Sequence, residues 1–114
     1  LSTQGDTRWN GDSKGAHDPC PNGYRVPTET EWEAERENFS SNNATGAYDS
    51  NLKLPVAGNR NRSDGMLYNV GSAGYYWSST VSGTGARSLD FGISTANVNS
   101  NNRAHGFSVR CIKD

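Results

Sequence analysis

The chain contains few apolar residues and almost no net charge. Only 32% of its 114 residues are hydrophobic, and the formal net charge is −1. A charge so close to zero provides no basic surface for nucleic acid and no polybasic patch for an anionic membrane. No apolar run approaches the roughly 20 residues that cross a bilayer. We therefore expect no nucleic-acid partner and no direct membrane insertion.

Residue sets that catalyse reactions or hold metals are missing as well. His17 and His105 lie far apart, and neither belongs to an HExxH motif or a spaced Cys/His set. The glycine-rich stretches 71–76 and 83–88 do not open a helix, as a phosphate-binding loop must. Loops rich in Asp and Asn could supply oxygen ligands, but no EF-hand spacing occurs. The sequence thus predicts neither an enzyme nor a cofactor or metal site.

The length and the aromatic content fit one domain spanning residues 1–114. Single domains commonly contain about 100–150 residues, and eleven aromatic residues spread along the chain argue against disorder. Residues 1–16 are polar, and we expect them to form an extension or to be partly ordered. The core must be small, because glycine, serine and asparagine make up so much of the chain.

The chain has only two cysteines, Cys20 and Cys111, whose spacing excludes a CxxC motif. They are either two buried thiols or one disulfide, and we favour the disulfide. The alternation in "GFSVRCIKD" places Phe107, Val109 and Cys111 on one inward face of a last strand. Cys111 can then meet Cys20 if the first and last strands are neighbours. A disulfide implies an oxidising compartment.

The segment "CPNGYRVPTETEWEAERENF", residues 20–39, gives the clearest local prediction. A short strand at 24–26 is followed by Thr28, which can cap a helix, and Glu31 completes a capping box. We expect this helix over residues 29–38, with Trp32 and Phe39 facing inward. Its five glutamates are spaced by two residues, which scatters them around the helix as a solvated surface.

The rest of the chain is predicted to form short strands joined by long polar loops. We expect a loop at 39–51 and a polar turn at 59–65. In the strand at 86–92, Leu89 and Phe91 should face inward, and Ser88 and Asp90 outward. The other expected strands lie at 52–58, within 65–80, and at 106–114. One helix with several antiparallel strands indicates a small α+β domain.

Four separated motifs resemble one known family. "DPCPNGYRVPTETEWEAE", "LKLPVAGNR", "GYYWSST" and "RAHGFSVRCIKD" are similar in order and spacing to the Fibrobacter succinogenes major paralogous domain family. This resemblance implies a surface or secreted protein of gut bacteria of the Bacteroides kind. It also implies a C-type-lectin-like fold, with paired N- and C-terminal strands, one or two helices and long loops that carry the binding face. Formylglycine-generating enzymes share that fold, but their catalytic cysteines have no counterpart in this sequence.

The C-terminal region also resembles the variable proteins of diversity-generating retroelements. There, an error-prone reverse transcriptase turns template asparagine codons into any codon ending in a pyrimidine. Such codons cannot encode Glu, Lys, Gln, Met or Trp. Residues 78–110 contain none of these five types, whereas residues 1–77 contain twelve of them. The composition therefore fits a diversified segment.

This second resemblance implies two groups of residues. One group stays constant and holds the fold, and we call it the frame; the other varies and contacts the ligand. The frame residues are Trp77, Ser78, Ser79, Ala86, Leu89, Phe91, Arg103, Gly106 and Phe107. The expected ligand-binding residues, each reachable from an asparagine codon and expected to point to solvent, are Ser82, Gly83, Arg87, Ser88, Asp90, Gly92, Ile93, Thr95, Ala96 and His105. Arg87, Ile93 and His105 are the expected anchors, because binding surfaces combine small polar residues with a few larger ones.

We therefore expect a ligand-binding domain, hypervariable in sequence, that recognises a protein or a glycan. It would belong to a larger surface or phage protein and lie at the cell surface, outside the cell or on a phage particle. The alternative is a structural module of a surface lipoprotein or fimbrial protein, whose loops bind nothing specific. A relative of the formylglycine-generating enzymes is a third, more distant alternative.

Overall fold

Three small antiparallel sheets and two helices make up the part of the chain that the computed structural model describes, residue 9 and residues 16–114. The α+β class predicted from the sequence is confirmed. In chain order the elements are β1 (Tyr24–Arg25), α1 (Glu29–Glu37), α2 (Ala44–Asp49), β2 (Asn59–Arg60), β3 (Leu67–Tyr68), β4 (Gly74–Ser82), β5 (Gly85–Phe91), β6 (Ala96–Asn102) and β7 (Ile112–Lys113). The expectation for residues 1–16 lies, apart from Trp9 and Ala16, outside the described residues.

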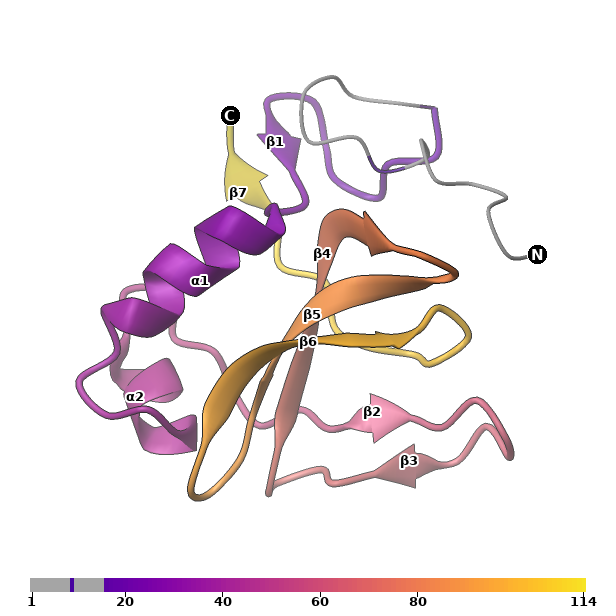
Figure 1. Cartoon of the computed structure of the whole chain (residues 1–114). Helices are drawn as coiled ribbons and strands as arrows, with labels where there is room; N and C mark the ends of the chain where they lie inside the picture. Colours follow the sequence, from indigo (N-terminus) through magenta and orange to yellow (C-terminus); the bar gives the residue numbers. More distant parts are fainter. Residues whose placement is uncertain (1–8, 10–15) are drawn as a thin grey trace.

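The sheet β4–β5–β6 organises the domain, and both helices lie on the same side of it (Figure 1). Its helix-side residues Tyr76, Leu89 and Phe91 are buried, as is Ala96. They form one core cluster with Trp32 of α1, Ala47 of α2 and Leu54. The indole Nε1 of Trp32 donates to the carbonyl of Trp77 at 3.1 Å, which ties α1 to β4. The small core predicted from the composition therefore lies between the helices and one face of the sheet.

Helix α1 begins where the capping box was predicted. The hydroxyl of Thr28 accepts from the N–H of Glu31, and the Glu31 carboxylate accepts from the N–H of Thr28 at 2.8 Å. Arg25 of β1 forms a two-bond ion pair with the same carboxylate. The cap and the ion pair together orient α1 relative to β1.

The two ends of the described chain are joined twice. Strands β1 and β7 pair antiparallel, with Tyr24 opposite Lys113. The predicted disulfide is present: Cys20 is bonded to Cys111, with 5.8 Å between their Cα atoms. Such a bond is typical of proteins from oxidising compartments. In the described part of the chain, neither helix is long and apolar enough to cross a membrane.

The last strand is shorter than predicted, and Val109 is exposed rather than inward. Before β7, the chain bridges two other sheets in turn. Gly106 exchanges backbone hydrogen bonds with Arg60 of β2, and Ser108 bonds the backbones of Tyr75 and Trp77 in β4. Crossing between sheets interrupts the alternation on which the prediction for Val109 depended.

Three further elements differ from the sequence-based expectation. The expected loop 39–51 contains α2, whose N-cap Asn43 accepts from the N–H of Gly46 at 3.1 Å. The expected strand 52–58 is irregular, because Lys53 adopts a left-handed backbone, with φ at 52°. The asparagine-rich segment expected to be a loop forms strand β6, which pairs with β5 over its whole length.

Candidate ligand-binding surface

The sheet β4–β5–β6 has two chemically different faces, and the strand register assigns each residue to one of them. Tyr75, Asp90 and Asn97 are directly opposite one another, as are Trp77, Ser88 and Asn99. We call the surface of these six residues, together with Ala86 and Asn101, the outer face. The opposite surface, which packs on α1 and α2, is the helix face. Opposed residues on paired strands share a face, so the division follows from the backbone alone.

A polar cluster occupies the centre of the outer face. The Asp90 carboxylate accepts from the Ser88 hydroxyl at 2.6 Å and from the amides of Asn101 at 3.1 Å and Asn99 at 3.3 Å. Asn101 also donates to Ser88 at 2.8 Å. Burial raises the pKa of Asp90 above its usual range, although these hydrogen bonds act in the opposite direction. The carboxylate is thus held by neutral donors and has no ion-pair partner among them.

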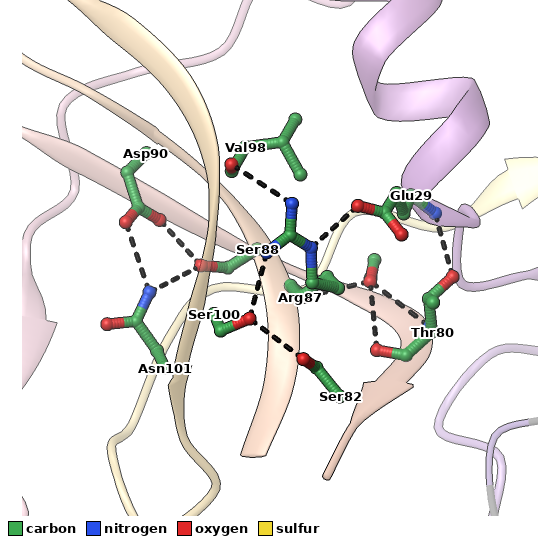
Figure 2. A network of polar contacts seen from close by, with 10 residues as sticks. Glu29, Thr80, Ser82, Arg87, Ser88, Asp90, Val98, Ser100 and Asn101 are labelled. Atoms are coloured by element: carbon green, nitrogen blue, oxygen red, sulfur yellow. Dashed lines mark hydrogen bonds and ion pairs between the residues drawn. The ribbon is translucent and has the colours of Figure 1, made fainter.

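Arg87 and Ser82, both expected to bind the ligand, belong to the helix face instead. Figure 2 shows Arg87 directed toward Glu29 at the start of α1, with 2.6 Å between Nε and Oε2. Its Nη1 donates to Ser100 at 2.8 Å, and Ser100 donates to Ser82. Arg87 therefore connects β5, β6 and α1, and an anchoring role toward a ligand would require breaking these contacts.

Two more residues of the expected set are not exposed. Ala96 is fully buried within the core cluster, opposite Phe91. Ser88 points to the outer face but is also fully buried, beneath the amide of Asn101 and beside Trp77. The expectation that all ten residues point to solvent is therefore wrong for these two.

The expected residues in turns lie at opposite ends of the sheet. Gly83 is in the β4–β5 turn, where its backbone is left-handed, with φ at 58°. Gly92, Ile93 and Thr95 form the β5–β6 turn at the other end, and Ile93 is 90% exposed. Successive turns of an antiparallel sheet alternate between its ends, so Gly83 and Ile93 cannot contact the same small ligand.

An aromatic cluster lies beside the polar cluster. The ring of Phe107 stacks on Trp77 at 4.3 Å, on Tyr75 at 5.0 Å and on His105 at 5.5 Å between centroids. Phe107 and Trp77 were expected as frame residues, and their packing fits that expectation. The same stack places Tyr75 and His105 at the edge of the outer face.

A pocket of about 310 Å³ opens next to this stack, between the outer face and the β2–β3 hairpin. Four amide side chains line it, from Asn59, Asn61, Asn69 and Asn101. Four rings complete the lining, from Tyr68, Tyr75, His105 and Phe107. The pKa of the Tyr75 phenol is raised, by burial first and then by the charge of Asp90, so this hydroxyl is protonated at neutral pH.

Among the expected ligand residues, only His105 lines the pocket. The hairpin residues Asn59, Asn61, Tyr68 and Asn69 were assigned to a turn and a short strand without a role. One signal could have located part of this surface. Asparagines at 97, 99 and 101 recur with period two, which is the pattern of a strand with one polar face.

The described segments contain no cluster of metal-ligating side chains: no group of three His, Cys, Asp or Glu side chains there could hold a metal ion. In comparisons with known proteins, no family model, no curated protein and no solved structure matches the chain. Function is therefore inferred from the residues of the outer face and the pocket.

Proposed function

We propose that this domain is a non-catalytic ligand-binding module with a C-type-lectin-like fold. It is displayed at a cell surface, outside the cell or on a phage particle, as part of a larger protein. Its outer face and the adjoining loops bind the ligand, a protein or a glycan. The residues that face outward are hypervariable through a diversity-generating retroelement.

The connection of the chain ends supports the proposed fold. The strands β1 and β7 are paired, and the Cys20–Cys111 disulfide joins the segments beside them. Two helices and the long irregular segments between α2 and β4 complete the features that the family resemblance implies. The disulfide also supports display in an oxidising environment.

One observation carries the proposed function: the core cluster shared with the helices packs on only one face of the sheet. Leu89 and Phe91 are buried under the helices, whereas the neighbouring residue Asp90 points to the other side. Neither helix covers the outer face, and the Phe107 segment packs on part of it. A face of polar side chains on a hydrogen-bonded sheet can change its chemistry while the core stays the same.

Strand β6 supports the proposal of hypervariability. Asn97, Asn99 and Asn101 lie on the outer face, and asparagine is what an unaltered template codon encodes. Ala96 and Val98, on the helix face of the same strand, contact the core instead. Opposite Asn97 and Asn99, β5 carries Asp90 and Ser88, both of which single asparagine codons can become. The asparagines themselves therefore occupy outward positions of β6, and the residues opposite Asn97 and Asn99 on β5 are compatible with the same template codon.

The proposal is tested by exchanging outer-face residues as a pair. We expect Asn97→Tyr with Asn99→His, which keeps an N–H donor near Asp90, to leave the thermal midpoint within a few degrees, because surface substitutions cost only about 0.5 kcal/mol each. The matched control Ala96→Asn changes the next residue of the same strand and should unfold the domain, since it buries an amide in the core.

Binding is read by capture from surface extracts of gut bacteria and of epithelial cells. The folded double variant should lose or change the partners that the unaltered domain captures. A folded double variant with every original partner would place the binding surface elsewhere. A domain that captures nothing in either extract would favour the purely structural module. A genomic near-copy of the DNA for residues 75–111, beside a reverse transcriptase gene, would independently support diversification.

A further inference from the structure

We propose that the pocket between the β2–β3 hairpin and the outer face binds one uncharged sugar ring of a glycan, without a metal ion. This inference rests on the proposed function, because it names the ligand class for one part of the same surface. Apart from His105 and Phe107, it concerns residues that the resemblance to variable proteins did not single out. Three properties of the pocket lead to it: its polar groups, its rings and its size.

The polar groups of the pocket are neutral. Amide side chains dominate, and each offers two N–H donors and a carbonyl acceptor. Sugar hydroxyls likewise donate and accept at the same time, so amides can satisfy them in pairs. Among the described residues, no lysine, arginine, aspartate or glutamate lines the pocket. A phosphate, a sulfated sugar or a sialic acid would therefore lose its hydration without gaining a counter-charge.

The rings offer the apolar surface that the C–H face of a sugar needs. Tyr68 is 42% exposed on the hairpin, and Tyr75 and His105 stand beside it around the pocket. Aromatic side chains combine a large apolar area with few rotatable bonds, so they bind at a low entropic cost. Aromatic rings beside convergent polar groups are a feature of small-molecule sites.

Contacts with Asp64 and among the lining residues hold these side chains in place before any ligand arrives. The Tyr68 hydroxyl donates to Asp64 at 2.5 Å. The amide of Asn69 spans the pocket, donating to Tyr75 and to Asn59 at 3.4 Å each. Asn69 itself has a left-handed backbone, with φ at 61°, a conformation that costs energy in most residues. Preorganisation of this kind reduces the entropy lost on binding.

His105 has a defined proton position that suits a hydroxyl acceptor. Its Nδ1 accepts from the backbone N–H of Arg62 at 3.3 Å. In the neutral ring the proton is then on Nε2, which can donate to a ligand. Stacking on Phe107 with 5° between the ring planes keeps the imidazole from turning.

The pocket volume fits one sugar ring rather than a longer glycan or a protein. About 310 Å³ is at the lower end of small-molecule sites, which range from about 300 to 1,000 Å³. A stable protein partner would instead bury about 1,600 Å² in total, far more than this hollow provides. A terminal sugar can enter here, while the rest of the glycan continues over the outer face.

The test uses methyl glycosides of glucose, galactose, mannose and N-acetylglucosamine as probes, titrated into the ¹⁵N-labelled domain in the presence of EDTA. We expect at least one to bind with a dissociation constant of about 1 mM, as ligand efficiency predicts for so small a molecule. The side-chain amide signals of Asn59, Asn69 and Asn101 should shift during the titration.

Variants then separate the roles of ring and amide. Tyr68→Ala should weaken the best glycoside about five- to tenfold, whereas Tyr68→Phe, which keeps the ring, should change it by less than about twofold. Asn69→Gly removes the amide but accommodates the left-handed backbone, and it should also weaken binding. The control Tyr48→Ala removes another exposed tyrosine, from α2 and outside the pocket, and should have no effect.

Several outcomes would overturn the inference. These are the absence of amide shifts with all four glycosides, equal effects of Tyr68→Ala and Tyr48→Ala, loss of binding in EDTA, and a preference for sialylated or sulfated sugars. The proposed function is judged separately. A partner that resists periodate oxidation of its sugars, yet is lost with the Asn97 and Asn99 exchange, would mean protein recognition by the outer face and no sugar pocket.

Discussion

Arg87 offers a direct choice between a ligand anchor and a part of the frame. The structure places its guanidinium 2.6 Å from the Glu29 carboxylate and 2.8 Å from the Ser100 hydroxyl. Both charged side chains are about one-third exposed, at 29% for Arg87 and 36% for Glu29. We expect Arg87→Met, which keeps much of the apolar stem, to destabilise the domain rather than to abolish ligand binding.

The magnitude follows from the two strongest contacts. A solvent-exposed ion pair contributes about 0.2–1 kcal/mol, and the bond to Ser100 about 1 kcal/mol. After allowance for solvent screening of the pair, Arg87→Met should cost about 1–2 kcal/mol in the free energy of unfolding. A double-mutant cycle of Arg87→Met with Glu29→Gln should give a coupling energy of about 0.5–1 kcal/mol.

The assay is urea denaturation of the four proteins of the cycle, repeated at low and at about 1 M salt. The coupling should decrease at high salt, because ions screen exposed charges. Binding of captured partners by folded Arg87→Met should be unchanged. A coupling energy below about 0.2 kcal/mol, combined with lost binding, would refute the frame role and restore Arg87 as an anchor.

Three further predictions concern stability. Replacing Cys20 and Cys111 with alanine should destabilise the domain by about 4–5 kcal/mol in denaturation, because the bond closes a sequence separation of 91 residues. Thiols that titrate in the native, non-reduced protein would contradict that bond. Glu31→Gln should lower stability by about 1–2 kcal/mol at neutral pH, since the hydrogen bond from Arg25 above all lowers the pKa of Glu31 to about 2 from 4.5. The stabilisation by the ionised Glu31 carboxylate is complete above pH 4.5 and is lost as the pH falls through about 2. A difference in unfolding free energy between Glu31→Gln and the unaltered protein that is as large below pH 2 as at neutral pH would contradict this. Trp77→Ala should cost about 3–5 kcal/mol, because the ring is buried against Phe107, and a melt within a degree or two of the unaltered protein would exclude this packing role.

The parts of the fold that could be predicted are those encoded by local chemistry. The capping box of Thr28 and Glu31 determines where α1 begins, whatever surrounds it. The Cys20–Cys111 disulfide could be predicted because the chain has only two cysteines and its end strands were expected to be neighbours. In both cases a few residues determine the result.

The missed elements depend on partners far away in the sequence. Asparagine is a poor strand former, so β6 appeared to be a loop, but pairing with β5 along seven residues outweighs that propensity. Helix α2 was missed because its sequence, with Gly46 inside it, has low helix propensity, whereas burial of Ala47 in the core favours it.

The candidate site was hard to predict for the same reason. Alternation correctly placed Leu89 and Phe91 inward, but Arg87 shares their face and was nevertheless assigned to the ligand. The pocket combines hairpin residues such as Tyr68 and Asn69 with Phe107, which are about 40 positions apart in sequence. No local pattern indicates that these segments meet.

The separation of the two sheet faces explains how a chain so poor in apolar residues supports a polar binding surface. The ladder bonds that hold β6 to β5 join backbone groups, so exchanging Asn97 or Asn99 removes none of them. Stability must then come from elsewhere, because a strand of asparagines contributes little of it. The helix-face core and the disulfide between the chain ends are the available sources. It follows that mutations of exposed outer-face residues such as Asn97 and Asn99 should change binding at nearly constant stability, whereas reduction of the disulfide should lower the stability of each such variant by a similar amount.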